Sequence, residues 1–167
     1  MNSTHLHLLL NHFPIIGTLI GSGLLLAGIF RKNYQLSNSA LTVLFIMAII
    51  AIPVYLTGEP AEESVEKISG VSETIIEAHE TAATVAIWLM MATGLTALIT
   101  LIIQFKSKTY KPALNYMVAL FALICFAAMA RTGYLGGQIR HTEISSTATI
   151  NANGLEMKAK DEEADND

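Results

Sequence analysis

Charged residues are scarce in this chain. Asp, Glu, Lys and Arg make up 14% of its 167 residues, whereas a soluble domain carries about a quarter. Few charges therefore interrupt the apolar stretches, and 52% of the residues are hydrophobic. A chain of this length is expected to form one domain, and its composition predicts a membrane protein instead of a soluble one.

Cysteine is limited to Cys125, which lies inside an apolar run. A single cysteine forms no disulfide within its own chain, so we expect a small buried hydrophobic side chain. The sequence also lacks a nucleotide-phosphate loop, a Gly-rich dinucleotide turn and a basic surface for nucleic acid. His79-Glu80 does not continue into a His-Glu-x-x-His zinc motif, because position 83 is alanine.

Four apolar runs are long enough to cross a bilayer as helices, which takes about 20 residues for a core of about 30 Å. We expect these helices at 8–30, 40–56, 80–105 and 112–134. No Lys or Arg precedes the first run and no small-residue cleavage pattern follows it, so we expect it to be retained. The predicted fold is an all-α, up-and-down four-helix membrane bundle over residues 1–141. A polar, acidic tail follows at 142–167 and is too poor in apolar residues to fold.

The charges of the connections predict the orientation in the membrane. Arg31 and Lys32 begin the first connection, and the third connection also carries only basic charges, Lys106, Lys108 and Lys111. The second connection, residues 57–79, is rich in glutamate. Because Lys and Arg accumulate on the cytoplasmic side, both termini and the acidic connection should face the periplasm of a bacterial inner membrane.

All five histidines fall near that outer face. Three of them, His5, His7 and His12, open the first helix, while His79 precedes the third and His141 follows the fourth. The basic connections and the tail contain none. Ionisable side chains at membrane depth are costly and usually mark a site, so this clustering is the main functional signal in the sequence.

The topology pairs these histidines. In an up-and-down bundle the first and third helices lie on a diagonal, so His12 and His79 should face each other across the bundle axis. Two imidazoles on opposite sides of a plane are the axial ligands that six-coordinate haem b requires. His7 and His141 lie nearer the surface and would form a second pair if a second haem b is bound. His5 has no evident partner.

Two arginines lie close to this region. Arg131 falls inside the outer end of the fourth helix, and Arg140 precedes His141. Haem propionates would give both guanidinium groups anionic partners. Equally, Arg131 can extend to lipid headgroups or pair with Glu77 or Glu80.

Small residues indicate where helices approach closely. Gly17, Gly21 and Gly28 form a small-residue row on the first helix. Ala82 and Ala86 follow His79 on its own helical face. Such an alanine face suits either a neighbouring helix or a flat macrocycle.

The competing chemistry is a small metal site. His79 with Glu80 and Glu77, or the other histidines, offers imidazole and carboxylate ligands suited to copper or zinc. A purely structural role, in which the histidines only cap helices, is the third alternative.

Four segments together resemble a family of proteins. They are HLLLNHFPIIG at His7 to Gly17, TGEPAEE at Thr57 to Glu63, IIEAHETAA at Ile75 to Ala83 and GYLGGQIRHTEI at Gly133 to Ile144. The family is an uncharacterised group of bacterial four-helix membrane proteins with a His-x4-His-Phe-Pro motif in the first helix and a Gly-Gly-x-x-x-His motif after the fourth. Its members sometimes occur joined to, or encoded beside, c-type cytochromes. The resemblance implies a redox setting, and its recurrent histidines fall on His7, His12, His79 and His141.

The sequence therefore predicts a multi-pass protein of the bacterial inner membrane that binds haem b and transfers electrons at the periplasmic side. Its expected partners are the lipid bilayer and other redox membrane subunits or a c-type cytochrome, and no nucleic acid. The alternative is an accessory membrane protein with a His/Glu copper or zinc site, or a structural subunit. Whether the protein is an enzyme stays open.

Overall fold

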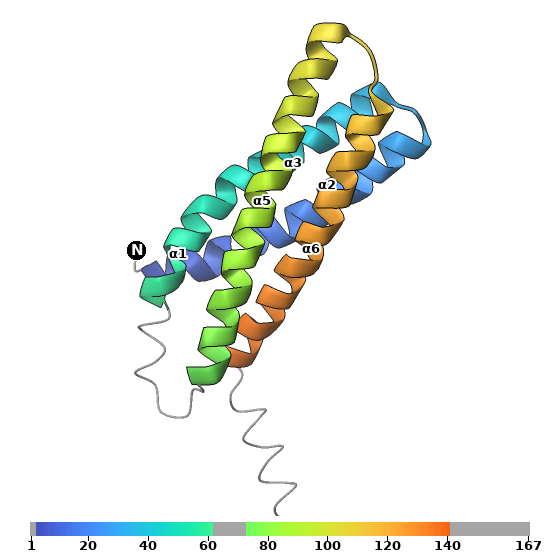
Figure 1. Cartoon of the computed structure of the whole chain (residues 1–167). Coiled ribbons are helices and arrows are strands. Elements are labelled where there is room, and N and C mark those ends of the chain that lie inside the picture. The colour runs from blue at the N-terminus through green and yellow to red at the C-terminus, as the bar shows by residue number, and fades with distance from the viewer. Residues whose placement is uncertain (1–2, 62–72, 141–167) are drawn as a thin grey trace, which may run out of the picture.

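The computed structural model describes residues 3–61 and 73–140, and these form an all-helical fold without strands (Figure 1). The helices are α1 (Ser3–Leu10), α2 (His12–Phe30), α3 (Tyr34–Leu56), α5 (Glu73–Ser107) and α6 (Pro112–Arg140). Four stretches are long and apolar enough to cross a membrane: His5–Phe30, Tyr34–Leu56, Glu73–Ser107 and Pro112–Ile139. The predicted all-α fold with four membrane-spanning helices is confirmed.

The first span is broken near its start. Only Asn11 separates α1 from α2, and its N–H still bonds to the carbonyl oxygen of His7 at 2.9 Å. Pro14 has no N–H to offer to the carbonyl of Leu10, and its ring crowds the preceding turn. The helix therefore bends one turn before the proline, and α1 packs against α3 as well as α2.

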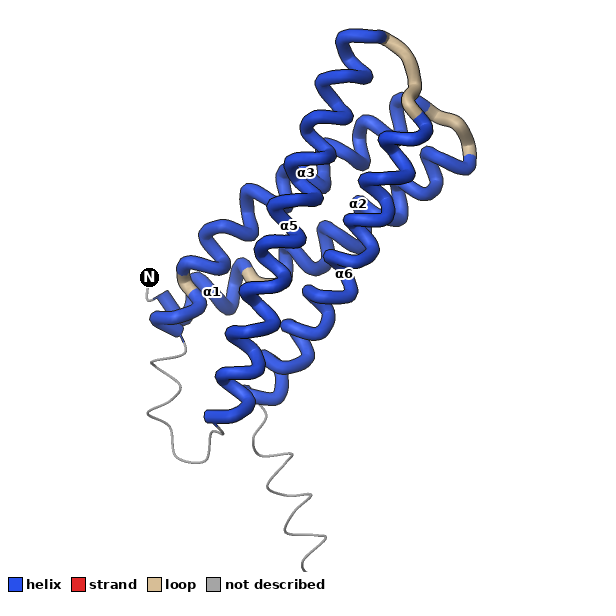
Figure 2. The backbone as a smooth tube through the Cα atoms, viewed as in Figure 1, coloured by secondary structure: helices blue, strands red, loops and turns tan. Residues whose placement is uncertain are grey.

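The four long helices form an up-and-down bundle (Figure 2). The main contacts join α2 to α3, α3 to α5, α5 to α6 and α2 to α6. As a result α2 lies diagonally opposite α5, as the topology predicted. We call the end of the bundle with α1, the C-terminal turns of α3 and α6 and the N-terminal turns of α5 the histidine end. The lysine end is the opposite end, with connections 31–33 and 108–111.

The helices approach closely where glycine lies at the contact. A Cβ added to Gly28 would lie 2.9 Å from the backbone nitrogen of Ser37, and one added to Gly21 would lie 2.8 Å from Leu44. A Cβ at Gly17 would overlap the sulfur of Met47. The small-residue row predicted on the first helix is therefore the contact face with α3. Lipid is as apolar as leucine, so this close packing itself is what associates the helices.

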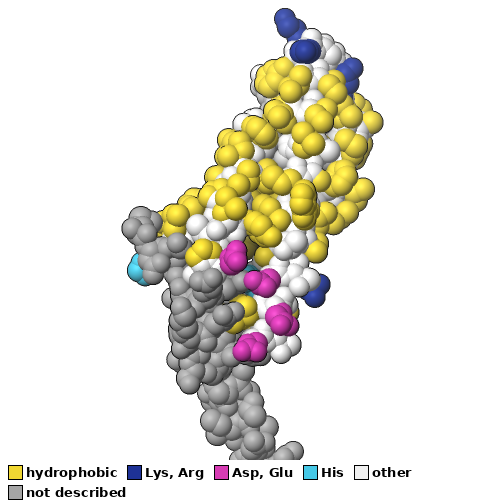
Figure 3. All heavy atoms as spheres, turned by 60° about the vertical axis from the view of Figure 1, so that its left-hand side comes forward, with side chains coloured by type: hydrophobic (Ala, Val, Ile, Leu, Met, Phe, Trp, Pro, Cys, Tyr) yellow, Lys and Arg dark blue, Asp and Glu magenta, His cyan; other side chains and the backbone are white. Residues whose placement is uncertain are grey.

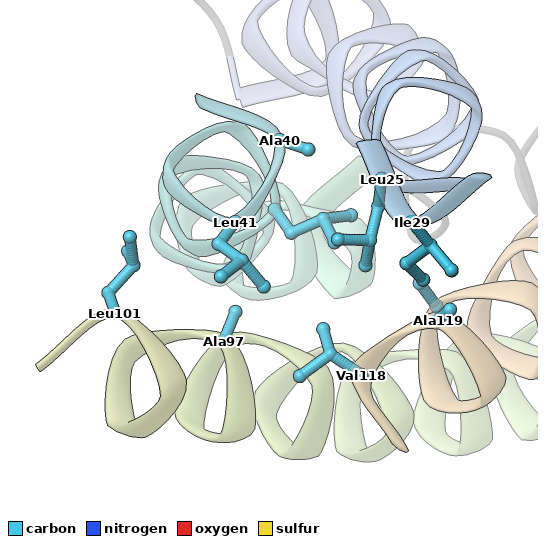
Figure 4. Packing of buried hydrophobic residues seen from close by; sticks show 10 residues of the cluster. Leu25, Ile29, Ala40, Leu41, Ala97, Leu101, Val118 and Ala119 are labelled. Atoms are coloured by element: carbon cyan, nitrogen blue, oxygen red, sulfur yellow. The ribbon is translucent and has the colours of Figure 1, made fainter. Parts of the chain in front are cut away.

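Buried side chains fill the axis of the bundle. The cluster nearest the lysine end contains Leu25, Ile29, Ala40, Leu41, Leu44, Ala97, Leu101, Val118, Ala119 and Ala122 (Figure 4). The outward faces are just as apolar, with Leu19, Ile49, Trp88, Leu95 and Leu120 all more than half exposed or close to it. Figure 3 shows this apolar belt between an end with only basic residues and an end where acidic residues gather beside a basic one. Such a surface is suited to contact with a lipid bilayer.

Several helix ends differ from the sequence-based boundaries: the first helix begins at Ser3 instead of residue 8, and α3 begins at Tyr34 instead of residue 40. α5 begins at Glu73 instead of residue 80, so much of the predicted connection 57–79 is helical, and α6 continues to Arg140 instead of ending at 134. Glutamates in the first turns of α5 suit the positive end of the helix dipole. Ile76 is buried there, so the added turns also pack. Both helices therefore extend beyond their apolar runs at the histidine end.

A buried polar cluster, Asn38, Gln104 and Asn115, lies at the lysine end. The Nε2 group of Gln104 donates to Oδ1 of Asn38 at 3.0 Å, and its Oε1 accepts from Nδ2 of Asn115 at 3.1 Å and from the backbone N–H of Lys111 at 3.1 Å. Gln104 and Asn115 are fully buried. This cluster ties α3, α5 and α6 together where buried polar groups would otherwise lack partners.

Candidate functional site

His7 lies on α1 against the C-terminal end of α3. Its Nδ1 is 3.0 Å from the carbonyl oxygen of Val54, one of the last carbonyls of α3, which have no partner within their own helix. Thr57 donates to the same carbonyl from its hydroxyl at 3.1 Å. The ring is half-buried and lies beside Gly58, where an added Cβ would be 3.7 Å from Cε1.

His79 lies on α5 and reaches across to α6. Its Nδ1 is 3.0 Å from the carbonyl oxygen of Thr132. The half-buried ring packs on Gly136, where an added Cβ would lie 3.1 Å from Cε1. Gly136 is one turn after Thr132, so the missing side chain opens the path from the ring to this carbonyl. The neighbouring Gly137 has nothing within 4 Å of its Cβ position.

The two hydrogen bonds fix the tautomer of both rings. A carbonyl oxygen only accepts hydrogen bonds, so Nδ1 must carry the proton in His7 and in His79. In the neutral imidazole the lone pair is then on Nε2. Histidines that bind metals commonly donate their other ring N–H to a carbonyl in this way, which orients the ring and raises its basicity.

Both rings lie at the histidine end, where His7 bonds to the end of α3 and His79 to the end of α6. Glu80 follows His79 on α5 and is exposed. The histidine end therefore brings together two half-buried imidazoles, one from α1 and one from α5. They belong to the first and third membrane spans, which the sequence analysis placed diagonally opposite each other.

The other predicted histidines are placed differently. His12, the first residue of α2, and His5 on α1 are exposed. The described residues place His7 and His79 at the same end of the bundle, and the predicted pairing of His12 with His79 stays a prediction. His141, the proposed partner of His7 at a second haem, lies outside the described residues.

Two charged residues that the sequence predicted for the site, Glu77 and Arg131, line a shallow groove. The groove lies between α5 and α6 at the histidine end and has a volume of about 390 Å³. It is lined by Thr74, Glu77, Ala78, Thr81, Ala82, Val85, Ala128 and Arg131. Arg131, Glu77 and Glu80 are exposed, and the side chain of Arg140 lies outside the described part of the chain. Ala82 and Ala86 are buried, so the alanine face beside His79 is used for helix packing.

Among residues 3–61 and 73–140, no three His, Cys, Asp or Glu side chains gather as a metal-binding group. At the described histidine end, His7 and His79 are thus not joined by a third such side chain in one group. The carbonyls of Val54 and Thr132 and the glycines beside the rings were not identified from the sequence. In the sequence, these glycines were visible only as Gly136 in the Gly-Gly-x-x-x-His motif and as Gly58 directly after Thr57.

Comparisons of the chain with models of protein families, with curated proteins and with solved structures gave no match.

Proposed function

We propose that the protein binds haem b at the histidine end, with His7 and His79 as the axial ligands, and transfers electrons there. One observation carries the proposal: two imidazoles from different helices lie at the same end of the bundle, and each donates its Nδ1–H to a backbone carbonyl. Both therefore have the nitrogen lone pair on Nε2, the atom that would ligate iron.

The donor set suits haem better than a small metal ion. A porphyrin supplies four of the six iron ligands, so the chain has to supply only two. A tetrahedral zinc site takes three or four protein ligands. Gly58 and Gly136 place no side chain of their own against the rings, and Arg131 on the groove offers a cationic partner for a propionate.

The bound haem would supply one-electron chemistry, and the chain would determine how that chemistry is tuned. Val54 and Thr132 hold the two rings in orientation through their carbonyls. Hydrogen bonds from Nδ1 also make the imidazoles more basic, which favours the oxidised iron. Such a protein passes electrons without transforming a substrate of its own.

The location follows from the charge asymmetry. The lysine end carries only Lys and Arg, whereas the histidine end carries glutamates together with Arg131 (Figure 3). In a bacterial inner membrane the positive-inside rule then places the lysine end in the cytoplasm and both termini, with the two histidines, on the periplasmic side. Electron partners at that side would be other redox membrane subunits or a c-type cytochrome.

The test is a reduced-minus-oxidised difference spectrum of the full chain purified in detergent, with haem quantified by extraction. The proposal predicts sharp b-type bands and about one haem per chain. A colourless protein that carries copper or zinc in stoichiometric amount would support the small-metal alternative. A colourless protein without metal, after expression with ample haem, would leave His7 as a cap of α3 only.

A further inference from the structure

The groove between α5 and α6 carries opposite charges on its two walls. Glu77 lies on α5 and Arg131 on α6, and both side chains are exposed. Among the residues that the structure describes, neither side chain has a hydrogen-bond or ion-pair partner. Figure 3 shows acidic side chains and a basic one on the same face of the molecule, next to the apolar belt. The groove therefore presents a cation and an anion side by side to its surroundings.

Two tyrosines of α6 indicate how deep the groove lies in the membrane. Tyr116 and Tyr134 are 60% and 67% exposed. They are 18 residues apart, which corresponds to about 27 Å along a helix. The hydrocarbon core of a bilayer is about 30 Å thick, and tyrosines are enriched at both of its borders. Arg131 lies about one turn before Tyr134, so the groove crosses the border between the hydrocarbon and the headgroups.

The lining of the groove changes from apolar to charged along the bundle axis. Its inner part, toward the centre of the bundle, contains Val85 and Ala128. The bond from His79 to the carbonyl of Thr132 relates the levels of α5 and α6. Arg131 lies on the inner side of this bond along α6, and Glu77 lies on its outer side along α5. From the membrane outward, the order is therefore apolar residues, cation and anion.

A phospholipid with an amine in its headgroup has the complementary order. Its acyl chains are followed by a phosphate and then by a primary ammonium group. A guanidinium group binds phosphate oxygens through paired N–H donors, and a primary ammonium group offers three N–H donors to a carboxylate. The groove volume of about 390 Å³ is at the low end for sites of small organic ligands. It therefore suits a headgroup, with the acyl chains outside the groove in the bilayer.

We propose that the groove binds one phosphatidylethanolamine molecule of the leaflet at the histidine end, with Arg131 on its phosphate and Glu77 on its ammonium group. Phosphatidylcholine has no N–H to donate to Glu77, and phosphatidylglycerol has no cation. Neither of these lipids satisfies both walls of the groove. An apolar belt alone would contact all three lipids equally, so headgroup selectivity is what distinguishes the site.

The groove opens away from the proposed haem ligand. Thr81 in the groove comes two residues after His79, which is a rotation of about 200° around α5. Lipid binding is therefore independent of haem binding, although Arg131 is a candidate in both. The double variant His7→Ala with His79→Ala should lose the haem and retain the lipid preference. Loss of the preference in this variant would contradict a separate site.

Trp88 provides a fluorescent probe of the groove. It is the only tryptophan of the chain, it is 73% exposed, and it lies about one turn after Val85 on α5. Acyl chains of a lipid bound in the groove should therefore reach it. The test is quenching of Trp88 by lipids with brominated acyl chains, added to the purified full chain in uncharged maltoside micelles. Each brominated lipid is compared with its unbrominated form.

We expect half-maximal quenching at a concentration of phosphatidylethanolamine about 3- to 5-fold lower than that of phosphatidylcholine or phosphatidylglycerol. This is the upper part of the range for exposed ion pairs. Equal concentrations for the three lipids would overturn the proposal, because they would show lipid contact without a headgroup site.

Variants assign the two walls. Glu77→Gln should abolish the preference for phosphatidylethanolamine, and Glu77→Lys should shift it to phosphatidylglycerol. Arg131→Gln should weaken the binding of both lipids. Glu80→Gln is the matched control, because Glu80 is exposed on α5 and does not line the groove.

All of these positions are exposed, so the variants should fold and keep the thermal unfolding of the wild-type protein. A preference for phosphatidylethanolamine that persists in both Glu77→Gln and Arg131→Gln would contradict the assignment.

Discussion

The ring of His79 on α5 donates from Nδ1 to the backbone carbonyl oxygen of Thr132 on α6, 3.0 Å away. His7 on α1 makes the equivalent bond to the carbonyl oxygen of Val54 on α3. Two imidazoles on separate helices are thus anchored to the backbone of two further helices. These two bonds set the directions of both Nε2 atoms.

The space beside His79 depends on Gly136. In Gly136→Ala the new Cβ would lie 3.1 Å from Cε1 of His79, so the ring must shift and its bond to Thr132 must lengthen. We expect a loss of haem affinity of about 10-fold or more and a changed midpoint potential, measured by haem titration and redox titration. Gly137→Ala is the matched control, because its Cβ would meet nothing within 4 Å. If the two variants had the same haem affinity and the same midpoint potential, the position of the His79 ring would not matter for haem binding.

Replacing an axial ligand by a weaker one should change the cofactor without removing it. His7→Met offers iron a thioether in place of an imidazole, and methionine ligation raises the reduction potential of haem. We therefore expect a higher midpoint potential and a changed spectrum of the oxidised protein. His5→Met on the same helix, where the side chain is exposed, should leave both unchanged. An unaltered potential in His7→Met would show that another residue ligates the iron.

The polar cluster at the lysine end should be important for stability. Gln104→Leu removes the partner of Asn38 and of the Lys111 N–H and one of the two partners of the Asn115 amide group, which also donates to the Lys111 carbonyl oxygen. Hydrogen bonds between membrane helices contribute about 0.6 kcal/mol each, and buried groups left unpaired cost about 1–3 kcal/mol. We expect a loss of roughly 1–3 kcal/mol in the free energy of unfolding, measured by denaturation in mixed detergent micelles. Gln35→Leu, at an exposed position, should have almost no effect.

The orientation can be tested with single introduced cysteines in a Cys125→Ser background, which contains no other thiol. A membrane-impermeant maleimide applied to intact spheroplasts should label Glu59→Cys at the histidine end. It should label Ser107→Cys at the lysine end only after the membrane has been permeabilised. The reverse pattern would place the histidines in the cytoplasm and exclude periplasmic electron partners.

Much of the fold could be predicted because membrane spans depend on simple features. The lengths of the apolar runs located the four helices, and the glycine row marked the face of α2 that meets α3. The ends of α5 and α6 were missed because both helices extend past their apolar runs. The inward faces were also hard to predict, since residues that face lipid are as apolar as those in the core.

The sequence predicted histidines at this end of the bundle, and helical phase is one reason why we propose His7 with His79, while the pairing of His12 with His79 stays a prediction. His12 was chosen because it lies deeper in the first span than His7. Five residues on a helix correspond to a rotation of about 140°, so the two side chains cannot share a face, and the break at Asn11 changes their relation further. Hydrogen bonds to the carbonyls of Val54 and Thr132 depend on which helix ends meet. Sequence spacing does not contain that information.

Haem content of histidine variants tests the central proposal most directly. Each variant would be purified in the same detergent and its haem counted per chain, beside the wild-type protein. We predict that His7→Ala and His79→Ala lose the haem, while His5→Ala and His12→Ala retain it at the wild-type ratio. Full haem content in both His7→Ala and His79→Ala, or its loss in His12→Ala with retention in His7→Ala, would contradict the assignment of His7 and His79 as the axial pair.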